Sequence, residues 1–195
     1  KWLFLAEYSD KTLVRNHLAF ALGHRTTLTW TPSGHFAEVF VNGEHDGFYH
    51  ITEKVEDGSN RVDIGDTGFL LEIDQPDRLD PDDVSFQTPT YLINIKEPGL
   101  AYSDPEFAQV RQHINDFETV LFSYAFADPT NGYRAYADVD SFIDWFLVNE
   151  IAKNVDAQWY SSIFLHWIPG EKIQMGPIWD FDLGFGNVDY ADATY

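Results

Sequence analysis

The chain has 195 residues, a length that fits a single domain. Its 12 Lys and Arg stand against 32 Asp and Glu, which gives a net charge of -20, and 44% of its residues are hydrophobic. That hydrophobic content suffices for a packed core and excludes disorder of the whole chain. The charge argues against DNA or RNA as a partner, because their phosphates would be repelled. It suits divalent cations, a basic protein partner or simple solubility.

No run of residues approaches 18 consecutive apolar positions, so the sequence predicts no membrane span. The chain also contains no cysteine, which excludes disulfides within it, cysteine-ligated zinc and a thiol nucleophile.

The first hundred residues are expected to form mainly strands, with one helix. Asp10 is a suitable cap for a helix through the leucines that follow, and Gly23 stands where a residue just past a helix end is expected. Asn42-Gly43 is typical of a tight hairpin turn, since both residues tolerate positive φ. Residues 75–89 are rich in Asp and Pro and are predicted to be a surface loop. Strands are predicted over 36–41, 47–55, 68–74 and 91–96.

From Asp104 the hydrophobic period becomes helical. Apolar residues recur at steps of three and four, at Phe107, Val110, Ile114, Phe117 and Leu121. A break at 128–132 precedes a second predicted helix, with Asp138 as its cap and its last apolar residue at Ile151. A second hairpin is predicted from strands over 162–167 and 172–175.

The order of these elements predicts an α+β fold with an antiparallel sheet. We expect residues 1–195 to form one domain, in which 1–100 are mainly strands plus one helix and 101–195 are helices and a hairpin. The chain starts like a strand entered midway, and residues 189–195 close no obvious element. We therefore expect a fragment of a longer protein, truncated at both ends.

Three aspartates flank the second hairpin. Asp156 follows the predicted helix, and Asp180 and Asp182 follow the hairpin. Because a hairpin returns the chain towards its start, Asp156 and Asp180 are expected to face one pocket. Phosphoryl transfer needs such a pair, one carboxylate to orient the acceptor hydroxyl and another to hold Mg²⁺ against the phosphates. Protein kinases have a catalytic-loop Asp, a short hairpin and an Asp-Phe-Gly triplet in the same order. On pattern alone, however, an Asp in a polar loop is more often a cap or a turn former.

The chain resembles the spore-coat CotH kinase family in a set of short blocks that occur in the same order. The matching blocks are DKTLVRNHLA (10–19), VNGE (41–44), GFY (47–49), TEK (52–54), NRVDI (60–64), VDSFIDWF (139–146), NEIAKNVD (149–156) and MGPIWDFD (175–182). Any one block is unspecific, but the ordered set runs from Lys1 to about Asn187, nearly the whole chain.

The resemblance implies a divergent protein-kinase-like fold that transfers phosphate from ATP to Ser or Thr of a protein. It implies ATP and Mg²⁺ as cofactors, and an extracellular, cell-surface or spore-coat location. By position, Asp156 matches the catalytic-loop aspartate and Asp180 the metal-binding one. Asp182 matches either a second metal contact or a hydrogen-bonding partner of the loop backbone. Asn154 and Glu150 are expected to orient the catalytic loop, although a helix-end side chain in solvent fits Glu150 equally well.

A kinase also needs a cation near the nucleotide phosphates. Lys54 and Lys96 lie on predicted strands and are the candidates, with surface lysines as the alternative for each. Glu53 is a candidate to pair with such a lysine or to contact a cation, with a cross-strand surface pair as the alternative.

Three features depart from the ordinary kinase pattern. No glycine-rich phosphate loop precedes the first helix, and Ser161 stands where ordinary kinases place a metal-binding Asn, so that Ser161 or Ser162 is left to offer a hydroxyl. The family also continues past the MGPIWDFD block. Two other functions therefore remain open. One is a surface or extracellular binding module with the same fold, whose carboxylates are structural or bind Ca²⁺. The other is a metal-assisted phosphohydrolase.

Overall fold

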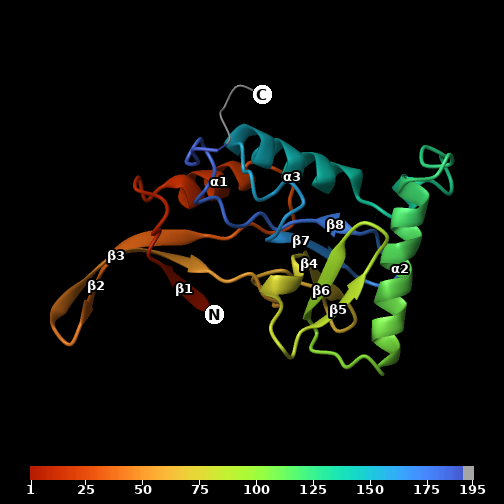
Figure 1. The fold of residues 1–195 in the computed structure, drawn as a ribbon, viewed down its shortest axis with the longest axis horizontal. Coiled ribbons are helices and arrows are strands. Elements are labelled where there is room, and N and C mark those ends of the chain that lie inside the picture. Colours follow the sequence, from red (N-terminus) through yellow and green to blue (C-terminus); the bar gives the residue numbers. More distant parts are fainter. Residues whose placement is uncertain (191–195) are drawn as a thin grey trace.

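The computed structural model describes residues 1–190, so the last five residues of the expected domain lie outside the described part. The described chain is an α+β structure with two antiparallel sheets (Figure 1). Its helices are α1 (Arg15–Gly23), α2 (Pro105–Leu121) and α3 (Val139–Ala152), with short 3-10 helices at Pro76–Arg78 and Tyr133–Ala135. Its strands are β1 (Trp2–Leu5), β2 (Gly34–Val41), β3 (Glu44–Glu53), β4 (Phe69–Ile73), β5 (Val84–Gln87), β6 (Leu92–Glu97), β7 (Ile163–Trp167) and β8 (Gln174–Met175).

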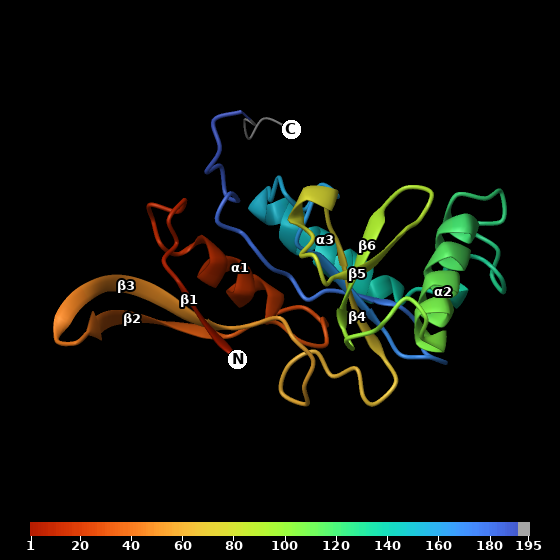
Figure 2. The ribbon, with the colours of Figure 1, turned by 60° about the horizontal axis from the view of Figure 1, so that its bottom comes forward.

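The N-terminal sheet has the order β1-β3-β2. Asn42 and Gly43 form the turn between β2 and β3 with φ of 53° and 86°, as their sequence predicts. Helix α1 covers one face of this sheet, where the ring of His17 lies 5.1 Å from that of Phe36 and 5.6 Å from that of His50. The β2–β3 hairpin projects away from the rest of the molecule (Figure 2).

The second sheet has the order β5-β6-β4-β7-β8, and its two faces differ in character. Because side chains alternate along a strand, the two faces carry different residues, and one of them packs on α2 and α3 in the main core. This face includes Leu71, Ile73, Ile93, Ile95, Ile163 and Leu165. The opposite face carries Glu72, Asp74, Asn94 and Lys96, and we call these four residues the polar face. Beside them, Leu70 and Phe164 are buried in a second, smaller hydrophobic cluster.

The structure corrects two predicted elements. The first helix begins at Arg15 rather than after Asp10, because Leu13 has a φ of 63° and the Asp10 carboxylate accepts hydrogen bonds from the amides of Thr12 and Arg15. Gly23 is the last residue of that helix rather than the first beyond it.

The segment 75–89 is not only a loop. It contains the 3-10 helix Pro76–Arg78 and strand β5, which pairs with β6 from Val84 to Gln87. The pairing is supported by tertiary packing, since Phe86 is buried in the main core. Within residues 1–190, no helix combines the length and the apolar character needed to cross a bilayer.

Candidate functional site

The hairpin of β7 and β8 brings three aspartates into one electrostatic neighbourhood. Burial is the main cause that raises the pKa of Asp180, to about 6, and the Asp182 and Asp156 carboxylates raise it further. Burial also raises the pKa of Asp156, with Asp182 adding to the shift and Arg78 opposing it. Asp156 therefore lies close enough to affect the proton affinity of Asp180, and Asp182 affects both.

Asp180 is fixed by the residues on either side of it. It has a φ of 63°, a conformation that costs energy for most residues other than Gly but that Asp tolerates. Phe181 is fully buried in the core, and its amide donates to Oδ1 of Asn16 at 2.7 Å. Since Asp180 and Asp182 flank this anchor, both carboxylates are held at the edge of the core.

Asn154 joins the loop of residues 153–162, which is the candidate catalytic loop, to the segment that carries Asp180. Helix α3 ends with Lys153 in the left-handed conformation, which turns the chain at the start of the loop. The Nδ2 atom of Asn154 then donates to the backbone oxygen of Asp180 at 3.1 Å and to Oδ1 of Asn149 at 3.2 Å. These bonds fix the start of the loop against the backbone of Asp180, and the orienting role of Asn154 stays a prediction.

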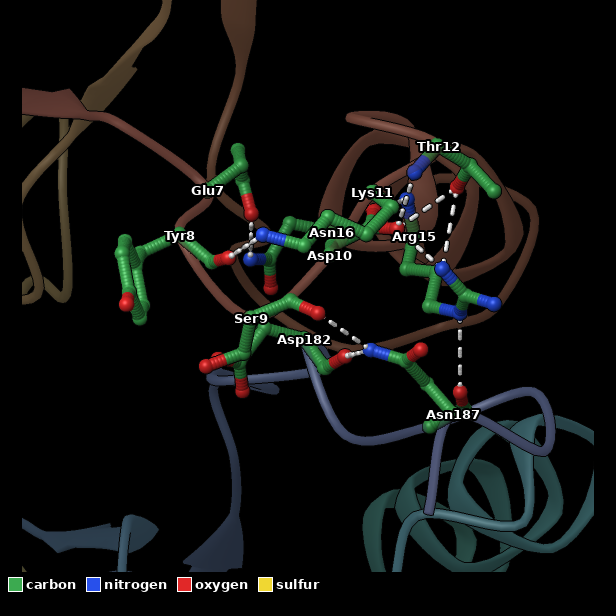
Figure 3. A network of polar contacts seen from close by, with 11 residues as sticks. Glu7, Tyr8, Ser9, Asp10, Lys11, Thr12, Arg15, Asn16, Asp182 and Asn187 are labelled. Atoms are coloured by element: carbon green, nitrogen blue, oxygen red, sulfur yellow. Dashed lines mark hydrogen bonds and ion pairs between the residues drawn. The ribbon is translucent and has the colours of Figure 1, made fainter. Parts of the chain in front are cut away.

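Residues of the N-terminal segment also hold the chain that follows Asp180 in place (Figure 3). Asn187 donates to the backbone oxygens of Ser9 and Asp182, at 2.8 and 2.7 Å. Arg15 pairs with the buried Asp10 and donates from Nε to the backbone oxygen of Gly184 at 3.1 Å. Segment 180–187 is thus attached by hydrogen bonds to Ser9 and Arg15, at either end of the turn that precedes α1.

Lys96 lies on the polar face and pairs with Glu72 at 3.2 Å. Burial alone would lower the pKa of Lys96, but the carboxylates of Glu72, Asp83 and Asp74 raise it. Burial in turn raises the pKa of Glu72, which Lys96 only partly offsets. One ammonium group therefore stands among three carboxylates and is fully charged at neutral pH.

The strand register brings the end of β4 next to the start of β7, close to Asp180. Ile73 of β4 pairs with Ile163 of β7, the residue after Ser162. Ser162 in turn donates from its hydroxyl to Oδ2 of Asp180 at 3.4 Å. Asp180 is thus connected through Ser162 to the strand that pairs with β4.

Other predicted residues lie elsewhere. Glu53 pairs with Arg61 and accepts the Ser33 amide at 2.9 Å, so it joins the end of β3 to neighbouring loops. Lys54 follows β3 and has no ion pair within residues 1–190. Glu150 is exposed on α3 and pairs with Lys153, an arrangement that matches the solvent-facing alternative.

The two serines that follow Asp156 have different surroundings. Ser161 is 2% exposed, and its hydroxyl has no hydrogen-bonding partner among the described residues. Ser162 is the one that contacts Asp180. If a hydroxyl takes the part of the absent kinase Asn, the geometry favours Ser162.

Two residues of this region escaped the sequence prediction. Glu72 is the lone carboxylate within the buried strand β4, and an acidic residue in an apolar run is a detectable signal, because buried charges need partners. Arg78 lies 5.5 Å from the centre of the Tyr160 ring, and Gln75 donates to the Tyr160 backbone oxygen at 2.9 Å. These contacts attach segment 75–78 to the catalytic loop, but no pattern in a segment predicted to be a loop indicates them.

Asp180 and Asp182 have the ligand chemistry that Mg²⁺ needs. Within residues 1–190 no three acidic or histidine side chains are close enough to form a metal site by themselves. Mg²⁺ is commonly held by only one or two carboxylates, with water and substrate phosphates as its other ligands. The repulsion that raises the pKa of Asp180 is also what a bound cation relieves, so these residues fit the group.

The comparison with known families agrees with the ordered blocks. The family model described as CotH kinase protein matches residues 1–194, essentially the whole chain. No curated protein shows a significant match to the chain. The chain belongs to the CotH kinase family.

Proposed function

We propose that this chain is an atypical protein kinase that transfers the γ-phosphate of ATP to a Ser or Thr hydroxyl of a protein, in a Mg²⁺-dependent reaction. The observation that carries the proposal is the grouping of Asp156, Asp180 and Asp182 beside the β7–β8 hairpin, where burial and neighbouring carboxylates raise the pKa of Asp156 and of Asp180. Together with Lys96, which pairs with Glu72 on the polar face, they would supply the charged groups that phosphoryl transfer requires. A spore-coat or cell-surface location and a basic protein as the acceptor belong to the same proposal.

In this reaction the acceptor oxygen forms a bond to the γ-phosphorus while the bond from that phosphorus to the ADP oxygen breaks. Asp156 accepts the hydroxyl proton, and its raised pKa makes it a better base for that transfer than an ordinary aspartate. Lys96 neutralises phosphate charge, held in place by Glu72. Asp180, with Asp182, would hold Mg²⁺, which supplies charge neutralisation at the phosphates when bound.

The first test is a calorimetric titration of ATP, with and without Mg²⁺, on the chain and on Asp180→Asn. We expect saturable binding that requires Mg²⁺ and that the substitution abolishes. The matched control is Asp140→Asn, since Asp140 is exposed in the first turn of α3 and makes no contact with the site. The control should bind ATP as the unsubstituted chain does.

Transfer is then measured with ATP radiolabelled at the γ-phosphate and a mixture of basic proteins as acceptors. Asp156→Ala should transfer orders of magnitude less label to the acceptor proteins than the unsubstituted chain does. Release of labelled phosphate from ATP in the absence of a protein acceptor would instead indicate a phosphohydrolase. A folded chain that binds no ATP would overturn the kinase proposal and favour the binding module. Near-full transfer by Asp156→Ala would show that Asp156 is not the base.

A further inference from the structure

A cavity of about 370 Å³, partly open to solvent, lies against the main core, and the phosphoryl-transfer proposal does not use it. It lies between α2, the start of α3 and the apolar face of the five-stranded sheet. Aliphatic and aromatic side chains form nearly all of its wall, including Ile114, Leu165 and Met175. A cavity of this size is within the range that binds small organic molecules.

One carboxylate interrupts this apolar wall. Glu118 of α2 lines the cavity and is 6% exposed, and its Oε1 atom has no hydrogen-bonding partner among the described residues. Tyr91 also lines the cavity, and its pKa is raised by burial and then by the Glu118 carboxylate. A buried carboxylate without a partner is costly, and a ligand that donates a charged hydrogen bond would remove much of that cost.

Aromatic rings surround the same space. The cavity wall includes Tyr91, Phe117, Phe122, Tyr133, Phe142 and Trp159. Aromatic faces attract organic cations through the ring quadrupole, and the attraction increases where water is excluded. A carboxylate within a wall of aromatic rings therefore favours an ammonium group over a neutral or anionic one.

We propose that this cavity binds a small apolar molecule with one primary ammonium group, which donates to Glu118 while its apolar part packs among the aromatic rings. The proposal concerns a ligand other than nucleotide and does not depend on kinase activity.

The cavity also touches the catalytic loop. Trp159, three residues after Asp156, stacks on Tyr91 with ring centres 5.2 Å apart and lies 6.0 Å from the ring of Trp145. Trp159 has a φ of 65° and is 45% exposed, so it lies where the cavity wall meets solvent. A ligand beneath this ring would change the environment of the catalytic loop, which makes Trp159 a natural reporter.

The test uses two probes of the same shape, 2-phenylethylamine and 2-phenylethanol, without nucleotide. Binding is measured by titration calorimetry and by tryptophan fluorescence, with Trp159→Phe to identify the reporter. We expect the amine to bind at least about tenfold more tightly than the alcohol, as a desolvated charge pair with cation-π contacts implies. Glu118→Gln should remove this preference, and it should fold because it retains the side-chain shape and removes a buried charge.

The matched control is Glu106→Gln, the same substitution on an exposed position of the same helix, which should leave both affinities unchanged. Ala137→Leu, which narrows the cavity, should weaken both probes together. Equal affinity for amine and alcohol would overturn the proposal, as would an amine affinity that Glu118→Gln leaves unchanged. Absence of saturable amine binding up to about 10 mM, with the chain folded, would overturn it as well.

Discussion

Asp180 combines burial, a left-handed backbone and two neighbouring carboxylates, so its ionised form is expensive in the metal-free chain. Its pKa is about 6 in the folded chain against an ordinary value of 3.8. The folded state therefore holds a proton that the unfolded state has released between these pH values. The contribution of Asp180 to the free energy of unfolding therefore falls as pH rises from about 4 to about 6.

Asp180→Asn removes this cost, so we expect the metal-free variant to be more stable than the unsubstituted chain at pH 7 by about 1–3 kcal/mol. The difference should vanish near pH 4, where Asp180 is protonated. Thermal unfolding followed by circular dichroism between pH 4 and 8 measures it, with Asp140→Asn as the control. Added Mg²⁺ should raise the melting temperature of the unsubstituted chain but not of Asp180→Asn. A stability difference that is constant with pH would contradict this explanation.

Lys96 and Lys54 can be separated by a matched pair of substitutions. Lys96→Met should weaken Mg²⁺-ATP binding or turnover by about a hundredfold, because a preorganised charge near the phosphates is lost. Lys54→Met should leave both nearly unchanged, since Lys54 lies beyond the end of β3 and away from the polar face. Because Lys96→Met also leaves Glu72 unpaired, the double variant with Glu72→Gln is needed to separate folding from function. A larger loss from Lys54→Met than from Lys96→Met would reverse the assignment.

Among the elements, the turn before α1 contributes more to the stability of the fold than its sequence indicates. Asp10 is fully buried and accepts bonds from the Thr12 hydroxyl at 2.6 Å, the Thr12 amide at 2.9 Å and the Arg15 amide at 2.8 Å. Burial alone would raise the pKa of Asp10, but these bonds lower it to about 2. Through Arg15 the same turn holds the backbone of Gly184.

We expect Asp10→Ala to destabilise the fold by about 3 kcal/mol, because the substitution removes a buried charge partner and several hydrogen bonds at once. It should also weaken Mg²⁺-ATP binding, since segment 180–187 loses an anchor. Chemical denaturation measures the first effect and calorimetry the second. The control is Asp128→Ala, an exposed turn aspartate that accepts the amides of Thr130 and Asn131, for which a much smaller change is expected. Equal losses for the two variants would show that burial of Asp10 does not matter.

The same turn shows how much of this fold can be predicted from its sequence. Local signals predicted the α+β class, the Asn42-Gly43 hairpin and the helices near α2 and α3, since turn chemistry and periodicity act over few residues. The start of α1 was missed because Asp10 binds the amides of Thr12 and Arg15 across a turn with a positive φ at Leu13, and β5 was missed because it depends on the packing of Phe86 in the core.

The candidate site divides in the same way. The ordered blocks named Asp156, Asp180 and Asp182, whose assigned roles remain predictions. The choice between Lys54 and Lys96 depends on which face of which sheet each occupies. Glu72 is detectable as an acidic residue in an apolar run, but its pairing with Lys96 depends on the strand register, and the contacts of Arg78 depend on the packing of segment 75–78. Pairings between residues far apart in the sequence leave no local pattern to read.

At the scale of the whole molecule, part of the net charge of -20 lies beside the candidate catalytic loop. Segment 75–83 contacts that loop through the bond of Gln75 to Tyr160, and its aspartates at 77, 80 and 82 are exposed. An acceptor peptide that approaches Asp156 therefore meets a field of negative charge. Such a field speeds the encounter with basic partners and slows it with acidic ones, and salt screens it.

We therefore expect the chain to prefer a Ser peptide flanked by Lys over the same peptide flanked by Glu, by about tenfold or more in kcat/KM at low salt. The preference should shrink at 0.3 M NaCl, where exposed charges are screened. The triple variant Asp77→Asn, Asp80→Asn and Asp82→Asn should lose most of the preference while it retains kcat, because none of the three residues faces the reacting atoms. A salt-independent preference would instead indicate a direct contact at the acceptor site, and a preference for the Glu peptide would show that the acidic segment plays no part in choosing the substrate.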